Sequence, residues 1–456
     1  MTNTLRYSLF LSLYGIATLC SAAPQPTLLA IGEMSETQDL SGLTGKLENG
    51  LDANVLGGIG SGLAYVGNNT FLALPDRGPN ATSWNPNVDD TTSYISRFHT
   101  ISMRLRDVVN GNLPMTLVPT MSSTTLLFSS SLLNYGDETP DNNTKNHFYF
   151  SGRSDNFLNG QPSTYPKNGR LDPEGIRVAH NKVYISDEYG PYVYEFNRET
   201  GRRMRVFTLP TELDADYLSA NGASEITNNT SGRVANKGME GLAITPDNKM
   251  LIGFEQSPLI QDGGDGGRAN RIVTIDIKTG ATHQYVYDNQ LPDPANPAKT
   301  KNYNSSEIVA LNSHEFLILE RDGKGLGDGS KAVLKRLYKI DLDGATDIGP
   351  LNISGEIALL PYAVQKILFL DIKEALKDKG IADTAVPAKL EGVAFGDDVV
   401  SQGLKYHTLW IANDNDFVPN VAGKNKFFVF GFTDNDLKQL GVKDGLVAQK
   451  LDNRDK

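Results

Sequence analysis

A short unit that joins an acidic turn to two apolar strands recurs along this 456-residue chain. In its clearest copy, residues 389–417, Glu391 and Gly392 precede the run Val393-Ala394-Phe395, and a second apolar run ends in Asn413-Asp414. Similar units begin near Ser61, Pro173, Met239 and Ser306. Because each copy contains strands separated by turn residues, the repeat restricts the chain to a repetitive antiparallel β fold.

The spacing of the copies predicts how the units are arranged. Gly175, Gly241 and Ile308 are separated by 66 and 67 positions, and a further strand repeats in step with them. Repeated units of several antiparallel strands are typical of a β-propeller, in which each blade buries its faces against its neighbours. We predict an all-β propeller of six blades over residues 28–432. The longer interval between Gly62 and Gly175 predicts one blade concealed in residues 103–165.

Several segments depart from the strand pattern. Residues 370–376 predict a short helix that Gly380 ends, and residues 261–268 predict a long hairpin connection rich in glycine and aspartate. That connection lacks the spacing of an EF-hand loop, which argues against a calcium site there. We predict that the closing strand lies near residues 427–432, and that the polar tail, residues 433–456, wraps the outside of the domain.

The N-terminus predicts export. Residues 1–22 combine Arg6, a short apolar run and a small-residue cleavage region, as in a secretory signal peptide, and they are too short to span a membrane stably. Cleavage there removes Cys20, the only cysteine. The net charge of −11, without a basic cluster, argues against a nucleic-acid partner. We expect a periplasmic or extracellular monomer without a membrane span.

The repeated units share acids at two positions, one in the incoming turn and one at the end of the following strand. These acids are Asp76, Glu174, Asp187, Glu188, Glu240, Glu255, Glu307, Glu320, Glu391 and Asp414. Equivalent positions of successive blades form a ring, so the carboxylates should converge around one end of the central channel. Such crowding requires a cation, nearby arginines or raised pKa values. Oxygen ligands without histidine or cysteine favour calcium over zinc.

A purely structural use of these acids is the alternative, since they would also repeat if they only tied strand ends to neighbouring amides. Arg77 and Arg321 break the symmetry, because each directly follows one of the acids. A guanidinium binds carboxylate or phosphate through two parallel hydrogen bonds, so this pair predicts binding of an anionic ligand. The six histidines show no metal-ligand spacing.

Several of these motifs together resemble the phytase-like family, described by its esterase-like activity of phytase. The resemblance covers roughly residues 28–432 and rests on Gly60-Ser61-Gly62-Leu63, Leu74-Pro75-Asp76-Arg77-Gly78-Pro79-Asn80, Asp172-Pro173-Glu174-Gly175-Ile176, Ser186-Asp187-Glu188-Tyr189-Gly190, Met239-Glu240-Gly241-Leu242-Ala243, Leu319-Glu320-Arg321-Asp322 and Leu390-Glu391-Gly392-Val393-Ala394. It implies a secreted or periplasmic propeller and a hydrolase acting on esters, including phosphate esters.

The sequence therefore leads to the hypothesis of a calcium-assisted ester hydrolase that acts on phosphomonoesters. We assign Glu174, Glu240, Glu307 and Glu391 as metal ligands. We assign Glu255 or Asp187 as general base, and Arg77 and Arg321 as the groups that bind the substrate anion. A lactonase or carboxylic ester hydrolase could use the same acids. A non-catalytic binding propeller stabilised by calcium is the alternative from another class.

Overall fold

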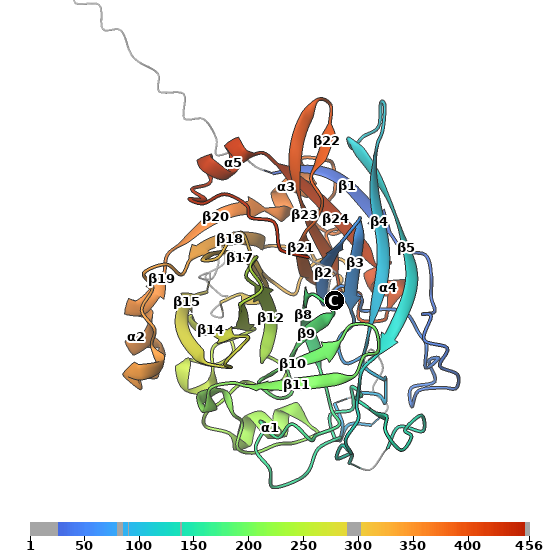
Figure 1. Cartoon of the computed structure of the whole chain (residues 1–456), viewed down its shortest axis with the longest axis vertical. Helices are drawn as coiled ribbons and strands as arrows, with labels where there is room; N and C mark the ends of the chain where they lie inside the picture. Colours follow the sequence, from blue (N-terminus) through green and yellow to red (C-terminus); the bar gives the residue numbers. More distant parts are fainter. Residues whose placement is uncertain (1–25, 80–84, 90, 137–138, 290–301, 452–456) are drawn as a thin grey trace, which may run out of the picture.

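The computed structural model describes residues 26–79, 85–89, 91–136, 139–289 and 302–451. In these residues five antiparallel sheets form the blades of a propeller, and Figure 1 shows inner strands β2, β8, β12 and β21 around a common centre. Blade 1 consists of β2 (Gly62–Gly67), β3 (Thr70–Leu74), β4 (Arg97–Asp107) and β5 (Met115–Leu126). Blade 2 consists of β8 (Pro173–Ala179), β9 (Lys182–Asp187), β10 (Tyr192–Asn197) and β11 (Arg203–Thr208).

The remaining blades follow the same order from the channel outward. Blade 3 consists of β12 (Met239–Ile244), β13 (Met250–Glu255), β14 (Ala269–Asp276) and β15 (Thr282–Asp288), with the short β19 (Ala363–Val364) at its edge. Blade 4 consists of β16 (Asn304–Ala310), β17 (Glu315–Arg321), β18 (Lys335–Asp341) and β20 (Lys366–Asp371). Blade 5 consists of β21 (Leu390–Phe395), β23 (Leu404–Asn413), β24 (Lys426–Phe432) and β1 (Thr27–Glu33), and β22 (Val399–Ser401) pairs with β23.

The ring closes by pairing its two ends. Strand β1 lies antiparallel to β24, so the first strand of the chain is the outer strand of the last blade. Apolar clusters fill the interfaces between neighbouring blades. Between blades 4 and 5, for example, Leu319 of β17 packs in one cluster with Leu409 and Ile411 of β23. Equivalent clusters join each other neighbouring pair of blades, so every sheet buries both faces.

The prediction of six blades is wrong, because residues 103–165 contain no further blade in the part that the structure describes. The strands β4 and β5 are 11 and 12 residues long, so their hairpin takes up much of the interval. The rest is loop with a two-stranded sheet of β6 (Phe128–Ser129) and β7 (Phe148–Tyr149). Its apolar side chains, including Leu133 and Phe150, pack into the interface of blades 1 and 2.

The helices are short, and all but the last lie between strands. They are α1 (Gly222–Asn228), α2 (Glu356–Leu359), α3 (Ile372–Lys377), α4 (Pro419–Ala422) and α5 (Asp434–Gln439), with 3-10 turns η1 (Thr211–Leu213), η2 (Ile260–Asp262), η3 (Gly349–Leu351) and η4 (Leu360–Tyr362). Helix α3 confirms the predicted helix, and the Asp371 side chain caps it by accepting from the amide of Glu374 at 3.1 Å. Among the described residues no helix has the length and apolar character needed to cross a bilayer.

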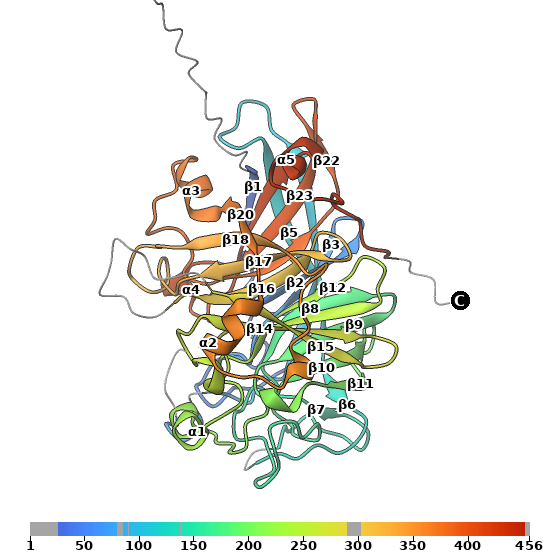
Figure 2. The same cartoon turned by 90° about the vertical axis from the view of Figure 1, so that its left-hand side faces the viewer.

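Two of the predicted segments, the connection over residues 261–268 and the C-terminal tail, lie largely within the described residues. The connection over residues 261–268 does join β13 to β14, but its Asp262 carboxylate is buried and paired with Arg271 at 2.7 Å. The C-terminal segment, which we call the strap (residues 433–451), crosses one end of the channel rather than wrapping the outside. In Figure 2 its dark red trace after α5 runs over one face of the propeller. The predicted signal peptide, residues 1–22, lies outside the described residues.

The first glycine-rich turn is packed against the last blade. A β-carbon added to Gly60 would lie 2.1 Å from the carbonyl oxygen of Asn413, which is backbone and cannot move away easily. We therefore expect Gly60→Ala to lower the free energy of unfolding by about 1–3 kcal/mol in urea denaturation. Gly323→Ala is the matched control, since nothing lies within 4 Å of its added carbon. Equal stability of the two variants would contradict this close approach.

Candidate functional site

In four of the blades, the pairing between the inner strand and the second strand shifts its register near the first residues of the inner strand. The shift lies between Pro173 and Ile176 in β8, and equivalent shifts occur in β12, β16 and β21. Such a bulge turns a side chain away from the regular alternation of a strand. As a result Glu174, Glu240 and Glu391, although buried, line a cavity at the start of the inner strands.

The pairing registers define a second ring of side chains at the end of the second strand of each blade or just after it. Its members are Asp76, Glu188, Gln256, Arg321 and Asp414, and all five line the same cavity. The first ring consists of the residues at one equivalent position near the start of the inner strands. They are the acids Glu174, Glu240 and Glu391 in three blades, and Ser61 and Ser306 in the other two. The two rings and the cavity of about 420 Å³ between them form what we call the acidic mouth.

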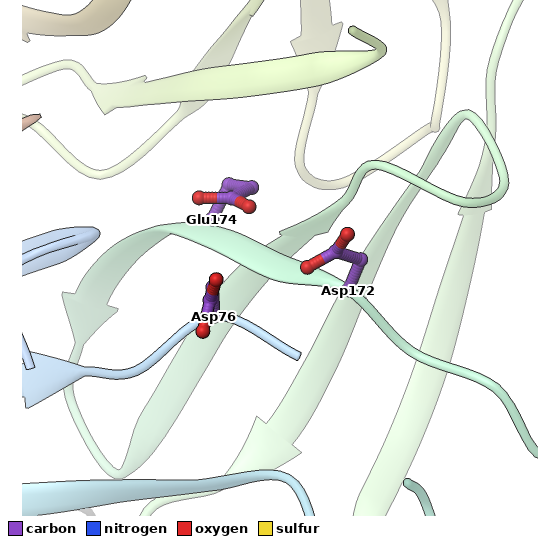
Figure 3. A group of neighbouring side chains, drawn as sticks. All are labelled: Asp76, Asp172 and Glu174. Atoms are coloured by element: carbon purple, nitrogen blue, oxygen red, sulfur yellow. The ribbon is translucent and has the colours of Figure 1, made fainter. Parts of the chain in front are cut away.

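Three groups of carboxylates in the acidic mouth lie close enough to share one ion. Asp76, Asp172 and Glu174 have ligand oxygens within 4.8 Å of one another, and Figure 3 shows the three carboxylates around a common space. Asp76 also groups with Asp414 and Asp416, and Glu174 with Glu188 and Glu240. Because these groups consist of oxygen donors, all buried except the half-buried Asp416, they can hold a hard divalent cation.

The electrostatics of the acidic mouth also fit a cation. Burial, followed by repulsion from neighbouring carboxylates, raises the pKa of Asp76, Glu174 and Glu188 well above the usual range. Burial and then Glu391 raise the pKa of Glu240 to about 8. One carboxylate oxygen of Glu188 is buried without a hydrogen-bond partner among the described residues. A cation bound beside Glu188 would satisfy that oxygen and relieve the repulsion.

Both predicted arginines lie in the acidic mouth. The Arg77 guanidinium donates to Asp172 at 2.7 Å and also to Asn236. Arg321 donates to Glu391 and lies 3.8 Å from Glu240. The Nε atom of each arginine is buried and has no hydrogen-bond partner among the described residues. The two guanidiniums therefore neutralise part of the acidic ring and keep an unused donor each.

Glu307, predicted as a metal ligand, lies outside the acidic mouth. In the register of β16 it occupies the position of Gly175 and Gly241, one residue beyond the ring position. Its carboxylate accepts from the amides of Leu242 and Ile308 at 3.0 Å and pairs with Arg177 at 3.1 Å. Aligning the apolar residues after the turn, rather than the acids, would have placed Ser306 in the ring.

Arg177 closes the channel behind the acidic mouth. Its guanidinium donates to the carbonyl oxygens of Leu63, Ile308 and Val393 at 2.8, 2.7 and 3.3 Å, which belong to inner strands of blades 1, 4 and 5. With Glu307 it forms a buried ion pair. The sequence did not reveal this residue, because only the closed ring brings these carbonyl groups together.

Asp187 and Glu255, predicted as general base, lie one position before the second ring and do not line the acidic mouth. Asp187 accepts from the amides of Asp172 and Tyr189 at 3.1 Å, and burial raises its pKa to about 7. Glu255 is completely buried, and burial raises its pKa to about 8. Both side chains therefore lie among the strand ends behind the acidic mouth.

Some residues of the site were not assigned from the sequence. Asp172 precedes the repeated acid of blade 2, Lys389 precedes that of blade 5, and Asp416 follows the second strand of blade 5. Lys389 donates to Asp414 at 3.0 Å and to Asp416 at 2.6 Å. In the sequence, only their closeness to the repeated acids could have indicated these three residues, because none of them recurs at the equivalent position of the other blades.

Comparisons with known proteins find both sequence relatives and solved structures. A secreted protein of uncharacterised function from Arthroderma benhamiae is 29% identical over 351 residues, which cover 63% of this chain and 64% of that protein. The solved structures that match include hydrazine synthase of Kuenenia stuttgartiensis, at 10% identity and a TM-score of 0.31 over 90% of this chain and 89% of that one. Trypanosoma rangeli sialidase matches at 12% identity and a TM-score of 0.30, over 83% of this chain and 44% of that one.

The family comparison covers most of the molecule. The family model described as "Phytase-like: Esterase-like activity of phytase" matches residues 54–417. The match includes the inner strands of all five blades and every residue of the two rings. The chain therefore belongs to the phytase-like family.

Proposed function

We propose that this protein is a secreted or periplasmic, metal-assisted ester hydrolase that acts on phosphomonoesters in the acidic mouth. The observation that carries the proposal is the close approach of buried carboxylates to two guanidiniums in one cavity. Family membership and a relative described as secreted support it. The mouth is assembled from the blades of one chain, which fits an active monomer.

The metal in this proposal is calcium, held first by Asp76, Asp172 and Glu174. The donors are oxygen only, and the orphaned oxygen of Glu188 lies in the adjoining group. A bound divalent cation supplies a Lewis acid that polarises a phosphoryl oxygen and acidifies a coordinated water. Glu240 and Glu391 complete the acidic ring beside this group, while Glu307, being bonded to Arg177, takes no part as a ligand.

The side chains of the mouth would divide the remaining work. Arg77 and Arg321 would bind the anionic group of the substrate through their free Nε–H donors. Glu240 lies within reach of Arg321 and holds a proton near neutral pH in the cation-free protein, because its pKa is about 8. We therefore assign Glu240, rather than Asp187 or Glu255, to move a proton at the ester oxygen.

The lining of the mouth favours a phosphate ester over a carboxylic ester. Its described side chains are charged or carry amide groups, with Tyr303 as the single aromatic residue. An acyl chain would require an apolar wall, whereas a phosphorylated polar molecule would not. The same argument weighs against a lactonase with an apolar substrate.

The ion pairs already made by both arginines favour the alternative of a non-catalytic, calcium-stabilised binding propeller.

Hydrolysis of a chromogenic phosphomonoester and a chromogenic carboxylic ester, with calcium and then with chelator, tests the proposal. We expect calcium-dependent turnover of the phosphate ester, and a decrease of about 100-fold in kcat/KM for Arg321→Gln. Arg336→Gln is the matched control, since Arg336 lies in the same blade but pairs with Asp371 away from the mouth. Folded protein that turns over neither ester would support the binding propeller instead.

A further inference from the structure

The strap covers a second cavity at the opposite end of the channel. This cavity of about 200 Å³ is lined by the ends of the inner strands, including Val309 and Ala394, and by Leu446 and Val447 of the strap. The Val447 amide donates to the Leu311 carbonyl at 2.8 Å. The Lys450 amide donates to the Pro246 carbonyl at 2.9 Å. The strap is therefore held as an extended segment across blades 4 and 3, with apolar side chains beneath it.

Two histidines of the propeller hold the strap in the same way. His314, between β16 and β17, lies 2.7 Å from Asp341 of β18 through Nδ1 and 2.7 Å from Asp444 of the strap through Nε2. His407 of β23 lies 2.7 Å from Asp398 through Nδ1 and 2.9 Å from Asp434 of α5 through Nε2. Each imidazole thus joins one carboxylate of the propeller to one carboxylate of the strap.

A histidine between two carboxylates makes both hydrogen bonds only when both ring nitrogens carry a proton. Loss of one proton leaves a lone pair facing a carboxylate oxygen, which replaces an attraction by a repulsion. For His314, the hydrogen bonds to Asp444 and Asp341 outweigh the effect of burial and raise the pKa of the imidazole. A raised pKa in the folded state means that the added stability is present at acidic pH and is lost as the pH rises through that pKa.

The other charged groups around these histidines are lysines and carboxylates that pair with one another. Lys443 pairs with Asp341 at 2.6 Å, and Glu315, next to His314, pairs with Lys339 at 2.7 Å. Lys405 pairs with Asp398 at 2.7 Å. Lys438 lies in the last turn of α5 and acts on Asp434. These neighbours are lysines and carboxylates, whose ordinary pKa values lie far from neutral, so the His314 imidazole is the group that changes between about pH 6 and pH 8.5.

We propose that the strap is a pH-dependent latch over the apolar cavity, held down by protonated His314 and released when this imidazole loses a proton. Release breaks the bonds of the strap to Leu311 and Pro246 and opens the cavity to solvent. The latch lies at the far end of the channel from the acidic mouth, and Arg177 separates the two ends. The proposal is therefore independent of the hydrolase activity.

Hydrogen exchange of the Val447 and Lys450 amides, corrected for the intrinsic rate, tests the latch in the full chain. We expect their protection to fall about tenfold between pH 6 and pH 8.5 in the unaltered protein, because the bonds of His314 to the strap weaken as its imidazole loses a proton. In the double variant His314→Gln, His407→Gln, protection should be low and the same at both pH values. Amides of β12 provide the internal reference for global stability.

His283→Gln is the matched control, because His283 of blade 3 pairs with Asp347, which lies outside the strap. It should keep the pH dependence of the unaltered protein. Asp444→Asn combined with Asp434→Asn provides a second route if the histidine variants fold poorly, and it should also abolish the dependence. Constant protection in the unaltered protein, or a tenfold fall that persists in the double histidine variant, would overturn the proposal.

Discussion

Replacing Arg177 by methionine is expected to lower the free energy of unfolding by about 3–5 kcal/mol. The substitution leaves the buried Glu307 carboxylate without its charged partner and removes the donors to the carbonyl groups of Leu63, Ile308 and Val393. Buried groups deprived of their partners cannot be solvated, so the full desolvation penalty remains. Urea denaturation followed by circular dichroism measures the loss.

Two further variants show whether the ion pair is the cause. Arg104→Met alters an exposed arginine of β4 and should change the stability by less than about 0.5 kcal/mol. The double variant Arg177→Met, Glu307→Gln removes both charges and should recover part of the stability lost in the single variant. If the double variant loses as much stability as the single variants Arg177→Met and Glu307→Gln together, Arg177 and Glu307 do not act as a pair.

Asp76→Asn is expected to abolish the stabilisation of the protein by calcium. Asp76 belongs to two of the three carboxylate groups, so its removal takes a ligand from both. For the unaltered protein, calcium at about 100 times its dissociation constant should raise the free energy of unfolding by about 2.7 kcal/mol. For Asp76→Asn at the same concentration, we expect a rise below about 1 kcal/mol, measured by urea denaturation with calcium or chelator.

The same variant makes a prediction of opposite sign without calcium. Burial and neighbouring acids raise the pKa of Asp76, so its charged form destabilises the cation-free protein at neutral pH. Asp76→Asn should therefore be at least as stable as the unaltered protein in chelator. Asp52→Asn, at an exposed aspartate paired with Lys46, is the control and should keep the calcium effect. A full calcium effect in Asp76→Asn would exclude the proposed cation site.

The repeat predicted the fold class and much of the acidic mouth, because both depend on local patterns that copy themselves. Alternating apolar runs with turn residues predicted the strands, and acids at equivalent positions predicted a ring that includes Glu174, Glu240 and Glu391. The blade count failed because interval length does not separate a missing blade from a long hairpin. Strands β4 and β5 extend the first blade and occupy the interval instead.

Acids that look equivalent in the sequence can lie one residue apart in the pairing registers of their blades, and this difference decides their roles. Glu307 follows Ser306, and this shift moves its carboxylate from the acidic mouth to the ion pair with Arg177. Glu188 and Glu255 both end a second strand in the sequence. By pairing register, however, Glu188 lies in the second ring and Glu255 lies one position behind it. Successive side chains of a strand point to opposite faces, so a one-residue change reverses the environment.

The sequence by itself determined the repetitive antiparallel strands, the family and the gathering of acids at the start of the inner strands. These features follow from residue type and spacing along the chain. Three features were decided only by the tertiary structure. They are the closure of five blades through the pairing of β1 with β24, the closing of the channel by Arg177, and the bonds of two histidines to the strap. Each of these joins residues far apart in the chain, and closure of the ring is what brings their side chains within hydrogen-bonding distance.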